Sequence, residues 1–186
     1  MGLREYQRKR SSGRSAGPRG RQKRKRKTNA PRFVIQHHAA RSDHYDFRPE
    51  IEGVLASWAV PKGPSVNPRD KRMARRTEDH PLEYETFEGV IPEGEYGAGP
   101  VIVWDHGTYT NEIRRSMARG LDRGHLSFRL DGEKLQGGFA LTHIRQGKDE
   151  TWLLVKKSDN DADARRRPVR TQPESVLSGR TLDELS

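Results

Sequence analysis

The pattern His44-x-Asp46-x-Arg48 holds the side chains best suited to chemistry in this sequence. In a β-strand alternate side chains share a face, so these three residues project together, while Tyr45 and Phe47 project from the opposite face. An imidazole beside a carboxylate suits a divalent transition metal, and a guanidinium fork suits a phosphate next to it. The pattern therefore predicts a metal and phosphate site on the polar face of a strand.

Two more polar residues lie close to this pattern in the sequence. His38 stands just before a short predicted loop, so it can fold back as a third metal ligand, and Gln36 lies two residues before it. The alternative is a solvated strand face that carries only an ion pair. Adding His38 and Gln36 favours a site, but the residues alone leave both interpretations open.

A second cluster contains His80 and Tyr84. His80 precedes Pro81, which favours an extended backbone at the histidine, and Tyr84 follows four residues later. Histidine can donate a proton near neutral pH, and a tyrosine hydroxyl can hydrogen-bond a phosphate oxygen. The alternative is a loop histidine beside a half-buried tyrosine, and the local pattern alone favours that interpretation.

The remaining polar motifs give weaker signals. Lys62 and Arg72 are single cations next to turns, a position where lysine and arginine usually only aid solubility. The glycine-rich segment 91–99 has neither the phosphate-loop spacing nor the dinucleotide spacing, so it predicts a structured turn between strands. The other histidines are expected to be structural or surface residues: His37, His106, His125 and His143.

Short alternating stretches separated by glycine, proline, asparagine and aspartate must position these residues. The predicted strands are Phe33–His37, His44–Ile51, Leu55–Val60, Arg72–Glu78, Glu83–Phe87, Val101–Trp104, Ser127–Leu130, Phe139–His143 and Trp152–Lys156. Many short strands at near-regular spacing predict an antiparallel barrel or sandwich. Short helices are expected at 111–119 and near the C-terminus, where Thr181 and Glu184 fit a capping box.

Charge is concentrated at the N-terminus. Residues 1–30 hold twelve Lys or Arg and one acid, a net charge of +11, whereas the other 156 residues carry −1. A segment this basic, with little to bury, is expected to be disordered in isolation. The sequence thus predicts a basic arm over 1–30, a barrel domain over 31–157 and a polar C-terminal tail over 158–186 with a short terminal helix.

Composition excludes several classes of protein. No apolar run approaches the roughly 18 residues that span a bilayer, and the basic N-terminus has no apolar segment typical of a secretory signal. Tyr6 stands where a myristoylation motif needs serine or threonine. The absence of cysteine excludes disulfides, thiolate metal sites and a cysteine nucleophile. We therefore expect an intracellular protein.

Several longer motifs follow one another in a fixed order: Phe33–Gln36 with His38, His44–Arg48, Ser57–Pro64, Glu78–Leu82 with Tyr84, Phe87–Gly89, Ile91–Gly94, Tyr96–Gly99, Val101–Asp105, Trp152–Lys156 and Ser175–Thr181. Together they resemble the 3'-phosphoesterase domain of bacterial DNA ligase D. The resemblance is strong over residues 31–157 and weak at both ends. Several long motifs in the same order make it specific.

The resemblance implies an all-β fold: a closed antiparallel β-barrel with a hydrophobic interior, few short helices and an active site on its outer surface. It implies a manganese-dependent hydrolase that heals 3' ends in DNA repair by non-homologous end joining; zinc or cobalt are other divalent metals that suit the site. Such an enzyme removes a terminal ribonucleoside to leave a 3'-phosphate, then hydrolyses that phosphate to a 3'-hydroxyl. The implied partners are DNA or RNA-containing DNA 3' ends and the ligase, polymerase and Ku components of end joining, in the nucleoid of a prokaryotic cytoplasm.

The family's functional residues can be carried over by motif. The matches to metal ligands are His38, His44 and Asp46; those to the groups around the scissile phosphate are Arg48, His80 and Tyr84; and those to supporting substrate-binding positions are Gln36, Lys62, Arg72 and Arg10. Family members often have acidic residues after the N-terminal Lys-Arg pair. Here Ser11 and Ser12 follow, which puts the diesterase step more in question than the monoesterase step.

Two other functions stay open at this point. One is a nucleic-acid-binding barrel without catalysis that uses the basic arm, and the other is a phosphoesterase-like regulator that has lost activity. Binding alone does not require the set of histidines and aspartate that the motifs supply. With no ligase or polymerase motif in the sequence, we expect a stand-alone form of the domain from a bacterium or archaeon.

Overall fold

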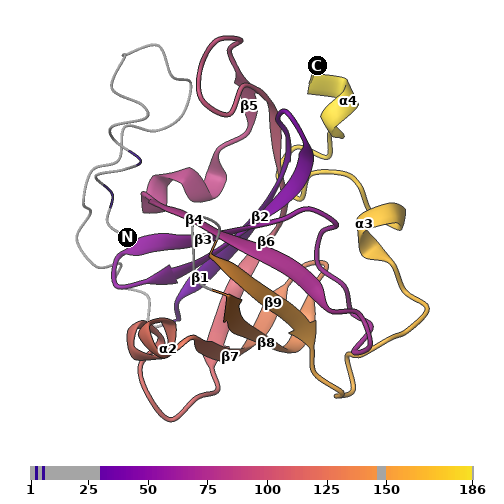
Figure 1. The fold of residues 1–186 in the computed structure, drawn as a ribbon. Helices are drawn as coiled ribbons and strands as arrows, with labels where there is room; N and C mark the ends of the chain where they lie inside the picture. The colour runs from indigo at the N-terminus through magenta and orange to yellow at the C-terminus, as the bar shows by residue number, and fades with distance from the viewer. Residues whose placement is uncertain (1–2, 4–5, 7–29, 146–149, 186) are drawn as a thin grey trace.

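Nine antiparallel strands form the framework of the molecule. In this computed structural model the described residues are Leu3, Tyr6, 30–145 and 150–185. The strands are β1 (Arg32–Ala39), β2 (Asp43–Ile51), β3 (Val54–Val60), β4 (Arg72–His80), β5 (Gly89–Ile91), β6 (Gly99–Asn111), β7 (His125–Gly132), β8 (Gln136–Arg145) and β9 (Thr151–Lys156). Figure 1 shows how they wrap around a common centre.

The sheet closes into a barrel because β1 pairs with both β2 and β6. The strand order is β1-β2-β3-β4-β9-β8-β7-β6 and back to β1, while β5 adds to one end of the long β6. Antiparallel pairs relate all neighbours around the ring. The predicted closed all-β barrel is confirmed.

Large aromatic side chains fill the barrel interior. The buried set includes Phe33, Phe47, Trp58, Trp104, Phe128, Phe139 and Trp152. Alternation along β2 places Tyr45 and Phe47 in this core, so the side chains between them lie on the outer wall, as predicted. Each fully buried aromatic side chain of this kind contributes about 1.5–3 kcal/mol.

Four short helical segments complete the described fold: η1 (Leu82–Thr86), α2 (Met117–Arg123), α3 (Pro168–Thr171) and α4 (Leu182–Leu185). The strand predicted at Glu83–Phe87 is wrong, because this segment is the 3-10 helix η1. Pro81 has no N–H with which to continue the β4 ladder, and its carbonyl accepts a hydrogen bond from the N–H of Tyr84 instead. The chain therefore turns back over the barrel wall.

The other helix predictions are partly correct. The helix expected at 111–119 lies at Met117–Arg123, because Asn111 still pairs with β7 and Ser116 caps the helix by accepting from the N–H of Arg119. The helix ends at Gly124, whose φ of 80° suits glycine. A C-terminal helix is present as α4, whereas α3 was not predicted.

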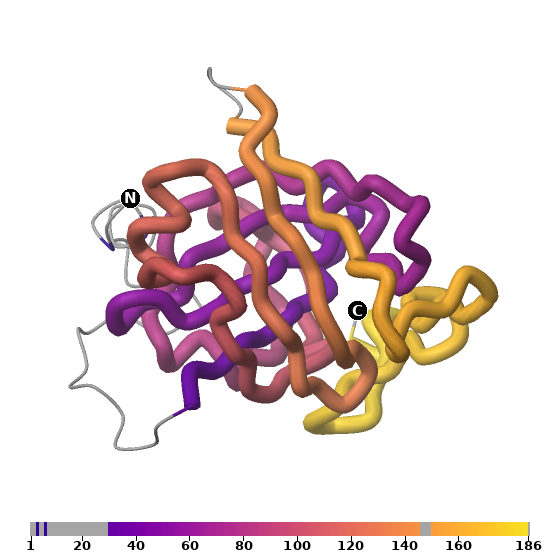
Figure 2. The backbone as a smooth tube through the Cα atoms, turned by 90° about the horizontal axis from the view of Figure 1, so that it is seen from below, coloured from indigo at the N-terminus to yellow at the C-terminus, as the bar shows by residue number. Residues whose placement is uncertain are grey.

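The C-terminal segment packs against the barrel body. The carbonyl of Gln172 accepts hydrogen bonds from the Trp104 indole and from Nζ of Lys134, and the N–H of Val176 bonds to the carbonyl of Val103. Figure 2 shows this segment, in yellow, gathered at one side of the barrel. Among the described residues, no helix has the length and apolarity needed to cross a membrane.

Candidate active site and metal centre

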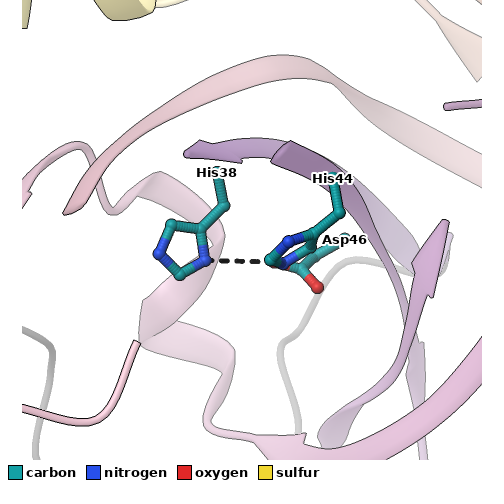
Figure 3. A group of neighbouring side chains, drawn as sticks. All are labelled: His38, His44 and Asp46. Carbon is teal, nitrogen blue, oxygen red and sulfur yellow. Dashed lines mark hydrogen bonds and ion pairs between the residues drawn. The ribbon is translucent and has the colours of Figure 1, made fainter. Parts of the chain in front are cut away.

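The predicted metal ligands meet on the outer wall near the hairpin between β1 and β2. His38 and His44 are cross-strand partners, and Asp46 follows on the same face of β2. One ligand atom from each lies within 4.8 Å of the others (Figure 3). Oδ2 of Asp46 is 3.1 Å from Nε2 of His44 and 3.7 Å from Nδ1 of His38. Two imidazoles and a carboxylate therefore converge on one point.

Backbone carbonyls fix the orientation of both imidazoles. Nε2 of His38 donates to the carbonyl of Gly97 at 2.6 Å, and Nδ1 of His44 donates to the carbonyl of Ser42 at 3.0 Å. Because a carbonyl can only accept, the proton of each neutral ring sits on that nitrogen, and the other nitrogen faces Asp46. Histidines that bind metals are commonly held in this way.

Arg48 links the candidate ligands to the rest of the site. Its Nη2 lies 3.2 Å from Oδ2 of Asp46, and its Nε donates to Oε1 of Gln36 at 2.8 Å. Gln36 is fully buried and in turn donates to the carbonyls of Tyr84 and Phe87. The guanidinium is thus held in place by a neutral acceptor as well as by a carboxylate.

This network controls the charge of the candidate ligands. Burial alone would raise the pKa of Asp46, but the adjacent Arg48 and the hydrogen bonds that His38 and His44 donate to the carboxylate when their rings are protonated outweigh it and hold the pKa well below its usual range. Burial lowers the pKa of His44, and the hydrogen bond and negative charge of Asp46 reverse this, so that the net shift is upward. Asp46 is therefore an anion at neutral pH.

The second predicted cluster joins the same site from a distant part of the chain. His80 ends β4, and its Nδ1 lies 2.9 Å from the carbonyl of Glu78 and 3.1 Å from Nη1 of Arg48. Since the Glu78 carbonyl can only accept, we assign the proton to Nδ1, and the approach of Arg48 is then a contact rather than a hydrogen bond. Tyr84, on η1, is buried with its ring 4.8 Å from that of His80.

The three candidate ligands line one cleft of about 740 Å³ together with Arg48, His80 and Tyr84. Its floor follows a cross-strand row in which Asp46 pairs with Ala59 and Ala59 pairs with Arg75. The small side chain of Ala59 leaves room above the floor. The glycine-rich turn at 94–98, between β5 and β6, forms part of the rim, as does the β1–β2 loop.

Several residues of the cleft were missed by the sequence patterns. Arg75, Thr77 and Glu78 line it from β4, and the alternation of β4 with Ala74 in the core could have placed Arg75 and Thr77 on the outer face. Tyr6 is fully buried, with its ring 4.7 Å from His80 and 6.0 Å from Tyr84. Leu3 and Tyr6 belong to the predicted basic arm, and both are buried.

Three predicted supporting residues are not part of this cleft as described. Lys62 and Arg72 line a second cleft instead, because Arg72 shares the inward face of β4 with Ala74. Arg10 lies outside the described residues, as does most of the predicted arm. The remaining supporting residue, Gln36, lies beneath the site as described above. The four histidines expected to be structural or surface residues lie outside the cleft.

The central part of the chain matches a known protein family. The model of the DNA ligase D 3'-phosphoesterase domain matches residues 36–143, which include every residue of the cleft. The chain belongs to this family. The match includes the candidate ligands together with Arg48, His80 and Tyr84, and it runs from within β1 to within β8, so that β9 lies outside it.

Two curated relatives show the extent of the similarity. The multifunctional non-homologous end joining protein LigD of Pseudomonas aeruginosa is 50% identical over 186 residues, which is 97% of this chain and 22% of that protein. The corresponding DNA repair protein LigD of Mycobacterium tuberculosis is 52% identical over 121 residues, 65% of this chain and 15% of that protein. The matched region thus spans about a fifth of the length of the first relative and about a seventh of the second.

Proposed function

We propose that this chain is a metal-dependent phosphoesterase that heals the 3' ends of DNA during repair by non-homologous end joining. The observation that carries the proposal is the convergence of His38, His44 and Asp46 within 4.8 Å beside the guanidinium of Arg48. A metal site next to an anchored cation suits a phosphate ester. A barrel that only bound nucleic acid would have no need for an ionised carboxylate buried between two oriented imidazoles.

The donor set fits a divalent transition metal. Both histidines present a nitrogen toward Asp46 while a carbonyl holds the opposite nitrogen, and the carboxylate is ionised. We propose Mn²⁺ as the resident ion, with Zn²⁺ and Co²⁺ as alternatives that suit the same ligands. When bound, such an ion polarises a phosphate oxygen and lowers the pKa of a bound water.

The protein groups around the ion would handle the phosphate and a proton. Arg48 would bind phosphate oxygens through the guanidinium that Gln36 and Asp46 hold in place, and Tyr84, whose ring centroid lies 5.2 Å from Cζ of Arg48, would assist from beside it. His80 has Nδ1 turned to the carbonyl of Glu78, so in the protonated imidazolium form Nε2 is the nitrogen that would donate a proton to the leaving alcohol or stabilise the pentacovalent state.

The proposed substrates are DNA 3' ends that carry a phosphate or a terminal ribonucleotide. The relatives are named as end-joining proteins, which supports placing the reaction beside ligase, polymerase and Ku components in a prokaryotic cytoplasm at the nucleoid. We propose that hydrolysis of the 3'-phosphate dominates over the diesterase step, because Ser11 and Ser12 stand where relatives often have acidic residues.

A primer-template assay tests this function. The wild-type chain should convert a 3'-phosphate end to a 3'-hydroxyl with Mn²⁺ and not with chelator. Asp46→Asn should abolish this turnover, whereas His125→Ala, a surface histidine outside the cleft, should not change it. Hydrolysis by Asp46→Asn at the wild-type rate, or no hydrolysis of either end by the wild-type chain with any of the three metals, would refute the proposal.

A further inference from the structure

A second cleft, of about 270 Å³, lies between the loop that follows β3 and the segment around α3. Its lining is strongly basic. The cations are Lys62, Arg72, Arg166, Arg167 and Arg170. The one carboxylate in the lining is Asp70, so the cleft has an excess of four positive charges.

The single acid leaves these cations largely uncompensated. Asp70 lies 3.6 Å from Nη2 of Arg72 and also accepts a hydrogen bond from the hydroxyl of Ser65. Nε of Arg72 is buried and has no hydrogen-bond partner among the described residues. That N–H is shielded from solvent, so a ligand can reach Arg72 only through its Nη groups; the side chain as a whole is 27% exposed.

Three arginines line this cleft from the C-terminal segment: one is held by hydrogen bonds, and the other two are exposed to solvent. Arg166 donates to the carbonyl of Lys134 and to Oε1 of Gln172, which anchors this wall to the barrel. The side chains of Arg167 and Arg170 are exposed and form no ion pair or hydrogen bond within the described part of the chain. Two guanidinium groups with five N–H donors each are therefore available for phosphate oxygens.

The basic cleft and the active cleft lie next to each other. Pro61 lines the active cleft and the next residue, Lys62, lines the basic one; on β4 the corresponding pair is Arg75 and Arg72. Three residues of strand span about 10 Å, at roughly 3.3 Å each. Because Arg72 faces inward and Arg75 outward, this length is a lower bound on the separation of the clefts, and at about 3.4 Å per nucleotide a nucleic-acid strand needs at least about three nucleotides to reach from one to the other.

The turn after β3, between Pro61 of the active cleft and Pro64 of the basic cleft, is well supported. Gly63 has a φ of 74°, and a Cβ at this position would come within 2.9 Å of both Tyr45 and Val169. The turn therefore packs tightly between the barrel core and α3. The position of the basic cleft relative to the metal ligands on β2 is thus set by packing and not by a mobile connection.

We propose that the basic cleft binds backbone phosphates of the strand whose 3' end occupies the active cleft. This inference rests on the proposed function, since it assumes a polynucleotide substrate. It assigns Arg167 and Arg170, which no sequence motif indicated, to the substrate-binding surface. It also predicts that Lys62 and Arg72 contact the bound nucleic-acid strand a few nucleotides from the reacting phosphate.

The test compares the full chain with an Arg167→Gln/Arg170→Gln variant. Affinity for a ten-nucleotide oligonucleotide with a 3'-phosphate is measured by fluorescence anisotropy between 50 and 200 mM salt. Each single-strand phosphate contact contributes about 0.7 to the salt slope, so the slope should fall by about 1.4. The control is Arg114→Gln/Arg115→Gln, two exposed arginines outside both clefts, which should leave the slope unchanged.

Probe length distinguishes a strand subsite from a site for any phosphate. A dinucleotide with the same 3'-phosphate cannot reach the basic cleft, so both double variants should bind it as the wild type does. In a second measurement, 1 mM inorganic phosphate should not displace the ten-nucleotide probe from the basic cleft. An unchanged slope for the Arg167/Arg170 variant, or an equal loss on the dinucleotide, would overturn the inference while leaving the hydrolysis result intact. Conversely, an altered slope in a chain that hydrolyses neither end would refute the proposed function alone.

Discussion

The two faces of β2 bury their residues to a similar extent but stabilise them in different ways. On the inner face Phe47 is 2% exposed and stacks on Phe128 at 5.4 Å. On the outer face Asp46 and Arg48 are each 4% exposed, but they lie among hydrogen-bonding partners. Apolar packing is shared among many neighbours, whereas a buried charge depends on each partner, because losing one leaves the other uncompensated.

Within β2, the inner-face residues should therefore contribute mainly to stability and the outer-face residues mainly to binding and catalysis. Changes on the inner face should lower the free energy of unfolding and leave the candidate metal site intact in the molecules that remain folded. Changes on the outer face should impair binding and turnover first. The substitutions below test this separation, beginning with the largest expected effect.

Phe47→Ala is expected to have the largest energetic effect, because it opens a cavity in the aromatic core. The free energy of unfolding should fall by about 3–5 kcal/mol, measured by urea denaturation. The control Met73→Ala removes an exposed side chain from β4 and should change stability by less than about 0.5 kcal/mol. Equal effects of the two substitutions would mean that Phe47 does not lie in a close-packed core.

His80→Ala should slow the reaction rather than destabilise the hydrophobic core. Loss of a positioned donor typically costs about 10²–10³ in rate, so single-turnover hydrolysis of a 3'-phosphate should slow by that factor. Mn²⁺ affinity should stay near the wild-type value, since His80 is not one of the three candidate ligands. If the variant kept the full rate on both monoester and diester ends, a catalytic role for His80 would be excluded.

Gln36→Leu should reduce stability and substrate binding together. It removes the acceptor of Nε of Arg48 and the donor to the carbonyls of Tyr84 and Phe87, at a cost of about 1–3 kcal/mol. Gln36→Glu keeps the acceptor, loses the donor to the two carbonyls and adds a negative charge beside Arg48. We therefore expect Gln36→Glu to retain a lower KM for the 3'-phosphate than Gln36→Leu, and identical KM values would contradict this arrangement.

Tyr6→Ala should have the smallest effect of the series on turnover. The ring of Tyr6 packs against His80 and Tyr84, and aromatic pairs contribute about 0.5–1.5 kcal/mol beyond burial. Converted to rate, this predicts a loss of up to about tenfold in kcat, with little change in KM for DNA. Tyr6→Phe keeps the ring and should restore most of the rate; a larger loss in Tyr6→Phe than in Tyr6→Ala would contradict a packing role.

The sequence is most informative where the relevant geometry is local. Alternation along β2 is enough to place Asp46 and Arg48 on one face and Phe47 on the other, because the period of two is a property of any strand. The same holds for the turn predicted within 91–99, which lies between β5 and β6. A histidine at a hairpin, such as His38, can also be placed from its neighbours.

The remaining features depend on how distant segments meet. His80 lies 32 residues from Arg48, and no local pattern brings them together; the resemblance to the family did so, and the structure shows the contact. Glu83–Phe87 alternates like a strand, but Pro81 ends the ladder and the segment turns into η1. Whether Arg72 faces the active cleft or the barrel end depends on the register of β4 against the core, which composition does not reveal.

Manganese binding tests the central claim most directly. The claim is that His38, His44 and Asp46 form one divalent-metal site. Titration of the full chain followed by Mn²⁺ electron paramagnetic resonance should give one site per chain. Single His38→Ala, His44→Ala and Asp46→Asn substitutions should each abolish that site, while His125→Ala and Phe47→Leu should retain it. A site that survives all three ligand substitutions, or a wild-type chain that binds no Mn²⁺, Zn²⁺ or Co²⁺, would contradict the account.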